Sequence, residues 1–367
     1  MNSLGINKSK KETKVVVAMS GGVDSSVVAA LMKEEGYNVT GITLKLYDDT
    51  TQSKEGRQCC AGQDILDAKR VSENININHK ILFYQKKFKS EVIDSFIDSY
   101  AAGETPIPCV QCNQTVKFRD LFKYAKDLNA DALITGHYVS RVQKNGNANM
   151  YRAKDQKRDQ SYFLFSTTQE QLDFLRFPLG SLTKNETRDL AKKLGLNVHD
   201  KKDSQDICFI PNGDYKSFIK LNSKEGNVLD RSGKIIGKHE GIHNFTIGQR
   251  RGMGIASDKP FYVVDILKDT NEIVVGDREN LLGQSLILDE LNFIMPDIDI
   301  SLPVLQIKCS AKIRSLSTPV EGTLHKKENI FSFTFDSPIE SITRGQACVL
   351  YDNERVLGGG IIKQKLN

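Results

Sequence analysis

The sequence lacks any apolar run that approaches the roughly 18 residues a helix needs to span a membrane. Its first twelve residues are polar and rich in lysine, without the apolar centre that is typical of a signal peptide. No internal repeat and no low-complexity segment is found in the 367 residues. We therefore expect a globular, cytoplasmic protein of two or three domains, with no membrane partner.

An excess of charge of one sign is also missing, because 51 Lys and Arg residues stand against 46 Asp and Glu residues, a net charge of +5. So small a total permits binding to nucleic acid through a local basic surface and does not require it. The seven cysteines are an odd number without a secretion signal, which argues against a disulfide framework. Each cysteine is then a buried filler, a metal ligand or a reactive thiol.

The first half of the chain alternates short β-branched segments with helical patterns. The predicted strands cover 14–19, 38–46, 75–83 and 132–135. The predicted helices cover 24–35, 64–73, 88–100 and 116–128. Strands separated by helices of this length imply a parallel sheet with right-handed crossovers, and hence an α/β domain.

Beyond about residue 204 the helical periodicity weakens, and from about residue 289 short alternating segments between turns dominate. Such segments are typical of a small antiparallel β-barrel. We predict three parts: an α/β domain over 1–210, a small middle module over 211–284 and a C-terminal β-barrel over 285–367.

The segment 20–26 (SGGVDSS) directly follows the first predicted strand and begins the first predicted helix. Gly21 and Gly22 permit a tight turn and a close approach of backbone to a ligand, while the helix N-terminus and the serine hydroxyls suit phosphate oxygens. Asp24 would repel a bare phosphate, so we expect it to hold a phosphate-bound Mg²⁺. The segment is neither a Walker A loop nor a dinucleotide fingerprint. The alternative is a Ser- and Gly-rich turn that only caps the helix.

SGGVDSS resembles the signature of the PP-loop ATP pyrophosphatases. That resemblance implies an adenine nucleotide alpha hydrolase-like sheet, cleavage of ATP between its α- and β-phosphates, and adenylation of a carbonyl oxygen that a nucleophile then displaces with AMP. The motif alone does not distinguish amidating, thiolating and ligating enzymes.

Two cysteines have neighbours that favour a thiolate. Cys112 follows a loop made rigid by Pro106 and Pro108 and precedes the helix predicted at 116–128, whose dipole would stabilise a negative sulfur. Cys208 follows Lys201 and Lys202, which would do the same. For either cysteine alone, a buried and inert thiol is the commoner case.

The pattern of the whole chain resembles the tRNA-specific 2-thiouridylase (MnmA) family. The matching stretches run in order over residues 14–360 and include SGGVDSSV, TPIPCVQCNQTVKF, TGHYVSR, SQDICFI, FTIGQRRG and RGQACVLYD. The resemblance implies an enzyme that uses ATP and Mg²⁺ to adenylate O2 of the wobble uridine in tRNAs of the Lys, Glu and Gln type. It implies that Cys208 carries a persulfide received from an upstream sulfur donor. Cys112 then assists as nucleophile and forms a disulfide with Cys208 on sulfur release.

The same resemblance implies the remaining site residues. The ATP-binding candidates are Ala18, Met19, Ser20, Gly21, Gly22, Val23, Asp24, Ser25, Leu44 and Gly136. The candidates for contact with the target base or the tRNA are Ile107, Pro108, Cys109, His137, Arg158, Asp159, Gln160, Arg314 and Gln346. Arg250, Arg251, Lys308 and Lys312 would join Arg314 in a phosphate-contacting surface, although such charges are more often only solvated. A neutral packing role is the alternative for His137.

The chain departs from the family at Cys109, where many members have an aspartate with an assigned acid–base role. Cys109 and Cys112 form a Cys-x-x-Cys pair, and with Cys208 they offer three thiolates. An iron–sulfur cluster that binds hydrosulfide is therefore an alternative to persulfide chemistry, as is a redox-active spare thiol at Cys109. Another adenylating RNA-modifying ligase is the remaining enzyme alternative. Cys59, Cys60, Cys309 and Cys348 are expected to be structural.

Overall fold

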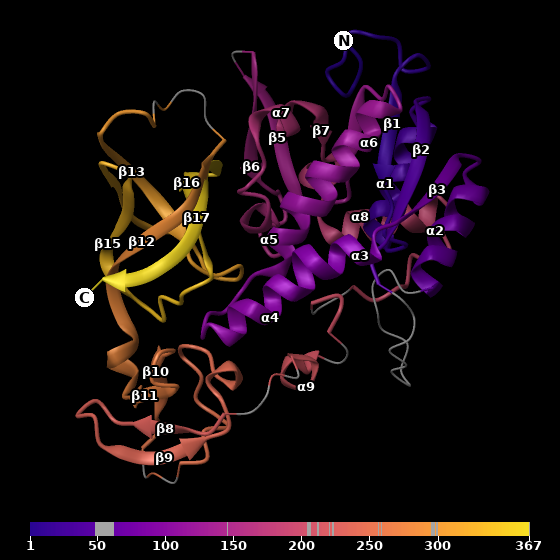
Figure 1. The fold of residues 1–367 in the computed structure, drawn as a ribbon. Helices are drawn as coiled ribbons and strands as arrows, with labels where there is room; N and C mark the ends of the chain where they lie inside the picture. Colours follow the sequence, from indigo (N-terminus) through magenta and orange to yellow (C-terminus); the bar gives the residue numbers. More distant parts are fainter. Residues whose placement is uncertain are drawn as a thin grey trace.

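The computed structural model describes residues 1–47, 62–144, 146–203, 207–210, 213–219, 221, 224–255, 257, 259–294, 298 and 300–366. An N-terminal α/β domain, a small middle β module and a C-terminal β-barrel follow one another along the chain, and the barrel and the middle module stand beside the α/β domain (Figure 1). Within these residues no helix is both long enough and apolar enough to cross a membrane. Cys59 and Cys60 lie outside the described residues.

The N-terminal domain is built on a five-stranded parallel sheet with the order β3-β2-β1-β4-β7. Its strands span Lys14–Ala18 (β1), Asn38–Lys45 (β2), Asn78–Phe83 (β3), Ala132–Ile134 (β4) and Leu175–Arg176 (β7). Because side chains alternate along a strand, Val15 and Val17 enter one hydrophobic core while Val16 enters another on the opposite face. The predicted parallel α/β sheet is confirmed.

Two groups of helices cover the two faces of this sheet. The helices of the Val15–Val17 face are Val23–Glu34 (α1), Gly62–Asn74 (α2) and Lys184–Lys193 (α8). The other face carries Gln85–Phe88 (α3), Lys89–Ile93 (π-helical), Asp94–Ala101 (α4), Pro108–Cys112 (α5), Asn113–Leu121 (π-helical), Phe122–Asp127 (α6) and Gln169–Phe174 (α7).

Two predicted elements have different bounds in the structure, and one hairpin was not predicted. Strand β3 begins at Asn78 rather than at residue 75, because α2 continues to Asn74 and Asn76 then turns the chain with φ 53°. The helix predicted from residue 116 begins at Pro108, since proline is well suited to the first turn of a helix. The hairpin Val139–Lys144 (β5) and Asn147–Arg152 (β6) was not predicted at all.

The barrel is a closed antiparallel sheet with the order β12-β15-β14-β13-β16-β17, in which pairing of β17 with β12 completes the circle. Its strands span Leu282–Phe293 (β12), Val304–Lys312 (β13), Val320–Lys327 (β14), Ile330–Glu340 (β15), Ala347–Asp352 (β16) and Arg355–Leu366 (β17). The predicted C-terminal barrel is confirmed.

The middle module is built on a four-stranded sheet with the order β10-β11-β8-β9, and the helix Tyr215–Ile219 (α9) that precedes it packs against the N-terminal domain. The strands of this sheet span Gly226–Leu229 (β8), Ile235–His239 (β9), Tyr262–Leu267 (β10) and Glu272–Gly276 (β11). A small core of its own, which includes Val228, Val263 and Ile273, fills this module.

Buried tyrosines join the barrel to the N-terminal domain. The Tyr162 hydroxyl donates to the Ala347 carbonyl oxygen at 3.0 Å, and the hydroxyls of Ser161 and Tyr351 lie 3.1 Å apart. Strand β17 also pairs with β6 of the unpredicted hairpin, at Arg355 and Tyr151. The two domains therefore share a buried polar seam and not only a covalent link.

Replacing Tyr162 with Phe should lower the free energy of unfolding by about 1–3 kcal/mol, because the Ala347 carbonyl would lose its buried donor. Urea titration of the full chain measures the change. The control is Tyr124→Phe, since the Tyr124 hydroxyl has no hydrogen-bond partner among the described residues and its loss should leave stability unchanged. Equal stability of the Tyr162→Phe variant and the parent would contradict the seam.

Candidate active site

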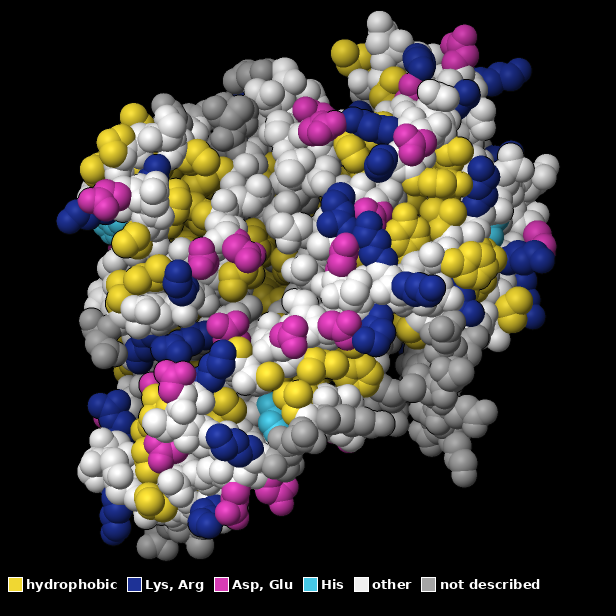
Figure 2. Space-filling model, in the orientation of Figure 1, with side chains coloured by type: hydrophobic (Ala, Val, Ile, Leu, Met, Phe, Trp, Pro, Cys, Tyr) yellow, Lys and Arg dark blue, Asp and Glu magenta, His cyan; other side chains and the backbone are white. Residues whose placement is uncertain are grey.

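A cavity of about 730 Å³ opens at the carboxyl ends of β1, β2 and β4, where ligands commonly bind in open parallel sheets. Figure 2 shows that the face drawn is hollowed between the barrel and the N-terminal domain. The predicted residues that line the cavity are Ala18, Met19, Ser20, Gly22, Val23, Asp24, Ser25, Leu44, Ile107, Pro108, Cys109, Cys112, Gly136, His137, Arg158, Gln160, Cys208 and Gln346. The structure thus brings the nucleotide candidates and both catalytic candidates together.

Two glycines set the shape of the phosphate loop. Gly21 has φ +75°, and a Cβ there would lie 2.0 Å from the Asp64 carbonyl oxygen, so α2 packs directly on the loop. A Cβ on Gly136 would lie 2.9 Å from the Ser25 amide nitrogen, so the end of β4 packs on the start of α1. Gly21 itself does not line the cavity, and its role is to shape the loop.

Serine hydroxyls complete the phosphate loop. The Ser26 hydroxyl donates to the Gly22 carbonyl oxygen at 2.8 Å, and the Ser20 amide donates to the Ser25 hydroxyl at 3.1 Å. Helix α1 begins after Gly22 without a side-chain cap, so its first amides stay available for a ligand. An uncapped helix start at a cavity favours phosphate binding over the capping alternative.

Asp24 is engaged by the protein itself. Both of its carboxylate oxygens lie 2.8 Å from Lys184 Nζ, and Tyr138 donates its hydroxyl to the same carboxylate at 2.9 Å. Among the described residues no group of three or more His, Cys, Asp or Glu side chains is arranged to hold a metal ion. These residues do not fit a protein-built Mg²⁺ site, and an ion there would take its ligands mainly from phosphate and water.

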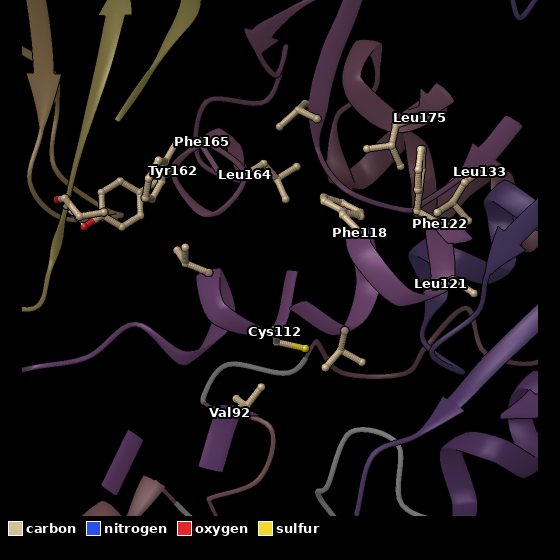
Figure 3. Packing of buried hydrophobic residues seen from close by; sticks show 14 of the residues in the cluster. Val92, Cys112, Phe118, Leu121, Phe122, Leu133, Tyr162, Leu164, Phe165 and Leu175 are labelled. Carbon is tan, nitrogen blue, oxygen red and sulfur yellow. Dashed lines mark hydrogen bonds between the residues drawn. The ribbon is translucent and has the colours of Figure 1, made fainter. Parts of the chain in front are cut away.

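Cys112 is not at a helix start, contrary to the prediction. The helical run begins at Pro108, so Cys112 is the last residue of α5 and continues directly into the π-helical segment. Its side chain is 7% exposed, within the apolar cluster that includes Val92 and Phe118 (Figure 3). Burial raises the pKa of the Cys112 thiol, and the positive charge of Lys117 only partly opposes this effect. Lys117, which the sequence analysis did not single out, is therefore the cation that favours a thiolate here.

Cys208 is half-buried, and its backbone is fixed from two sides. The Tyr47 hydroxyl donates to the Cys208 carbonyl oxygen at 3.0 Å. The next residue, Phe209, packs edge-on against Phe88 and Phe96, with ring centroids 5.7 and 5.4 Å apart. These contacts hold Cys208 at the wall of the cavity.

Lys201 does not have the predicted role beside Cys208. Its ammonium group lies 2.6 Å from a carboxylate oxygen of Asp64 and of Asp67, and it donates to the Gly21 carbonyl oxygen at 3.0 Å. The ammonium group of Lys201 therefore pairs with two carboxylates of α2 and binds the phosphate loop through the Gly21 carbonyl. Lys202 also lines the cavity.

The five described cysteines are all free thiols, and Cys109 is exposed. Cys109, Cys112 and Cys208 line one cavity, yet they do not form a three-ligand metal group in the part of the chain described. Cys309 and Cys348 are buried in the barrel, where burial raises the pKa of Cys309 to about 12 and raises that of Cys348 as well.

His137 lies at the cavity wall as a neutral side chain. Burial, and then the charge of Lys117, lower its pKa to about 3. Its Nδ1 lies 2.9 Å from the Thr135 hydroxyl, and its ring packs edge-on against Phe118 at 5.8 Å. His137 is thus packed and neutral at the wall of the cavity.

Two predicted RNA contacts lie elsewhere. The Asp159 carboxylate is buried outside the cavity, where it accepts bonds from the Ser161 hydroxyl at 2.7 Å and the Ala153 amide at 3.0 Å. It supports the turn that carries Arg158. Arg314 also does not line the cavity and donates to the Ser341 carbonyl at 3.4 Å.

The expected basic surface of the barrel is incomplete. Lys312 is 4% exposed beneath the ring of Tyr162, and Lys308 pairs with Asp336. On the face drawn in Figure 2, acidic and basic side chains are interspersed, with Lys and Arg gathered where the barrel meets the middle module. Gln346 lines the cavity but donates to the Thr105 carbonyl oxygen at 2.9 Å, and so joins the barrel to the loop before Cys109.

Sequence reasoning missed Lys184 and Asp203, which line the cavity as an ion pair 2.8 Å apart. No motif pointed to them, because Lys184 is in a run of polar residues that reads as a helix start. The capping box of Thr183 and Glu186 confirms that reading and explains why Lys184 is held in place.

A Gly136→Ala substitution should weaken ATP binding by about 1–3 kcal/mol, because the added methyl group would push β4 away from Ser25 and open the phosphate loop. Isothermal titration with ATP measures the loss. Gly237→Ala is the matched control, since its Cβ would meet its nearest atom at 3.4 Å in the middle module. Unchanged ATP affinity in the Gly136 variant would contradict the proposed loop geometry.

His137 should make folding stability depend on pH. Its unfolded pKa is about 6.5 and its folded pKa about 3, so the unfolded chain binds more protons in this window and stability falls as pH drops below about 6.5. His137→Gln should reduce that fall, as measured by urea unfolding at pH 7.5 and pH 5. If both proteins lose stability equally, His137 is not held neutral.

Comparison with known proteins identifies the family of this chain. Three family models match in succession: the tRNA methyl transferase HUP domain over 13–212, the tRNA methyl transferase PRC-barrel domain over 216–277 and the aminomethyltransferase beta-barrel domain over 283–362. A solved complex of a 4-thiouridine synthetase with RNA and bound ATP shares 18% identity with this chain, covers 52% of it and 43% of the synthetase chain, and has a TM-score of 0.34, too low to support an argument.

Full-length relatives are much closer. The tRNA-specific 2-thiouridylase MnmA of Hyphomonas neptunium is 48% identical over 373 residues, covering 100% of this chain and 95% of the relative. Those of Bartonella bacilliformis and Rickettsia massiliae are 50% and 49% identical, covering 99% and 98% of this chain and 95% and 100% of the relatives. The resemblance seen in the sequence is confirmed, and the chain belongs to the tRNA-specific 2-thiouridylase (MnmA) family.

Proposed function

We propose that this protein is a tRNA-uridine 2-sulfurtransferase, which uses ATP to replace O2 of the wobble uridine with sulfur in tRNAs of the Lys, Glu and Gln type. One observation carries the proposal: a single cavity is lined by the phosphate loop and by both Cys112 and Cys208. Activation of an oxygen and delivery of a sulfur require that nucleotide and thiol reach the same atom, and this cavity meets that requirement.

The first step is adenylation of the uridine. O2 attacks the α-phosphorus of ATP, diphosphate leaves, and O2 becomes part of an AMP leaving group. The N-terminal amides of α1 and the Ser20 and Ser25 hydroxyls are the donors that would hold the phosphates. Mg²⁺ bound to the phosphates would neutralise part of their charge, and Lys184, which lines the cavity, would add positive charge from the protein side.

The second step transfers sulfur. The terminal sulfur of a persulfide on Cys208 attacks C2 and AMP leaves with the former O2, so Cys208 is joined to the base through two sulfurs. The Cys112 thiolate then attacks Cys208 Sγ, which leaves the outer sulfur on C2 and forms a Cys112–Cys208 disulfide. An upstream donor must supply the persulfide, and an external thiol must supply two electrons to reduce the disulfide.

The buried state of Cys112 suits its late role. A thiol kept protonated by apolar surroundings attacks little until a charge or a base reaches it, so it does not reduce the persulfide prematurely. Many relatives have aspartate where this chain has Cys109, and the exposed Cys109 thiol offers no carboxylate for proton transfer. Lys117, through its charge, is the group that favours the Cys112 thiolate in this chain.

The descriptions of the matching domains and relatives differ in the group that is transferred. Two of the domains are described as tRNA methyl transferase domains, whereas the relatives are named as thiouridylases. The cavity supports sulfur transfer, because two cysteines that could carry and release sulfur line it together with the phosphate loop. The iron–sulfur alternative rests on the same three cysteines and gains no support from their arrangement, which forms no three-ligand group in the described chain.

The target uridine would reach this cavity only if it leaves the stacked anticodon loop, as reacting bases commonly do. Ile107, Pro108 and the exposed Cys109 line the cavity before Cys112 and would border the extruded base. Arg158, which is exposed at 44% of its side chain, and Gln160 would contact the tRNA nearby.

Substitution Cys208→Ser should abolish formation of 2-thiouridine, by at least about 10³-fold, because no other group in the scheme carries the transferred sulfur. The measurement is mass spectrometry of tRNA nucleosides after reaction with ATP and a persulfide donor. Cys309→Ser, in the barrel core, is the matched control.

Diphosphate release with tRNA should persist in Cys208→Ser, because adenylation precedes sulfur transfer. Thiolation that survives in Cys208→Ser would overturn the proposed role of this residue. Cys109→Asp should keep activity under the persulfide scheme, and its loss together with a visible cluster absorbance in the parent would favour the iron–sulfur alternative.

A further inference from the structure

The segment 199–203, which precedes Cys208, is held between helix α8 and the phosphate loop. From α8, Arg188 donates to the backbone carbonyls of His199 at 2.9 Å and Lys201 at 3.1 Å. On the other side, Lys201 reaches the Gly21 carbonyl at 3.0 Å. The chain that leads to Cys208 is thus anchored to the elements that would hold ATP.

Lys184 is the residue that joins the two sides. It lies one helical turn before Arg188 on α8, and positions four apart share one face of a helix. Its ammonium group is 2.8 Å from Asp24 in the phosphate loop and 2.8 Å from Asp203 in the anchored segment. The side chain of Lys184 is only 9% exposed at the cavity wall, whereas those of Asp24 and Asp203 are 32% and 18% exposed, so both ion pairs are partly shielded from water.

The charges around Lys184 are not fully balanced. Three cations, Lys184, Arg158 and Arg188, pair with the two carboxylates of Asp24 and Asp203, which leaves one excess positive charge within this cluster of five side chains. Burial alone would raise the pKa of the Asp203 carboxyl, but the hydrogen bond from Lys184 and the nearby cations lower it. Asp203 is therefore an anion that holds these cations together until phosphate oxygens arrive.

We propose that Lys184 is a positioning residue that couples the nucleotide site to the sulfur-carrying cysteine through its bridge to Asp203. A phosphate in the cavity would attract the ammonium group of Lys184, which also pairs with Asp24 and Asp203. These two ion pairs would then set the position of segment 199–203, and with it the position of Cys208, relative to the nucleotide. This inference rests on the proposed function, because it assigns Lys184 a part in sulfur delivery.

Asp203→Asn breaks the bridge on the cysteine side, together with the pairs of Asp203 with Arg158 and Arg188, and leaves the Asp24–Lys184 pair on the nucleotide side in place. Single-turnover sulfur transfer from the Cys208 persulfide should fall about 10- to 100-fold, as for a misplaced reactive group. Exchange of labelled diphosphate into ATP in the presence of tRNA, which reports adenylation, should fall clearly less than sulfur transfer does, because the Asp24–Lys184 pair remains. Lys184→Met should lower both rates, and Lys184→Arg should restore part of each because it retains the charge.

A second readout does not require activity. The rate at which iodoacetamide alkylates Cys208, followed by peptide mass spectrometry, should change at least about threefold in Asp203→Asn and Lys184→Met, since the segment loses its anchor. Saturating ATP should change this rate in the parent and not in Lys184→Met. The matched control is Lys154→Met, which removes the ion pair of Lys154 with Glu186 on the exposed side of α8.

Equal losses of adenylation and sulfur transfer in Asp203→Asn, or no loss of either together with unchanged alkylation, would overturn the coupling. Thermal unfolding of each variant identifies a global loss of structure, and the alkylation assay of Lys184→Arg tests the proposal if Lys184→Met does not fold. A parent protein that forms neither adenylate nor 2-thiouridine would contradict the proposed function, while the alkylation result would still decide whether Lys184 positions Cys208.

Discussion

The site depends on two places where the backbone leaves no room for a Cβ atom. At Gly21 the phosphate loop rests on the Asp64 carbonyl of α2, and at Gly136 the end of β4 rests on the start of α1. These contacts aim the amides of α1 into the cavity and expose the Gly21 carbonyl to Lys201. The same close backbone contacts thereby fix the phosphate loop and, through Lys201, the segment 199–203 that precedes Cys208.

The thiols show a second constraint, which is the balance between reactivity and burial. Cys112 lies in an apolar cluster on the face of the sheet that carries α3 to α7 (Figure 3), while Cys208 is half-buried and Cys109 is exposed. A buried thiol loses thiolate character, but it also escapes reaction with solvent and with small disulfides. The arrangement therefore protects Cys112, the thiol proposed to resolve the mixed disulfide. Because burial raises the pKa of this thiol, the charge of Lys117 is needed to favour its thiolate.

Much of the fold and part of the site could be predicted from the sequence, because the signals were local. The apolar run 14–19, the glycine pair of the phosphate loop and the alternating C-terminal segments each reflect contacts made by neighbouring residues. The predictions failed where contacts between segments far apart in the sequence determine the environment of a residue. The residues around Lys201 in the sequence do not indicate that it forms ion pairs with Asp64 and Asp67. The residues around Cys112 likewise do not indicate that Val92, from another segment, belongs to the same apolar cluster in the helical run that begins at Pro108.

The same reasoning explains why the hairpin β5–β6 and the residue Lys184 were missed. The hairpin is stabilised partly by pairing with β17, some two hundred residues away along the chain, and short polar strands carry little periodicity of their own. Lys184 acquires its role only when α8 packs beside α1 and Asp24 meets it. Long-range pairs of this kind leave no trace in a window of ten residues.

The ion pairs around Lys184 are poorly explained by stability alone. Taking charges out of water costs several kcal/mol per ion, and buried pairs often do no better than apolar side chains of similar volume. Apolar side chains at positions 24, 184 and 203 together could fill the same volume, yet they would offer nothing to a phosphate. A cation placed between the nucleotide loop and the cysteine segment has value only if those two parts must act together. The cost of burying Lys184 therefore points to chemistry that takes place across the cavity.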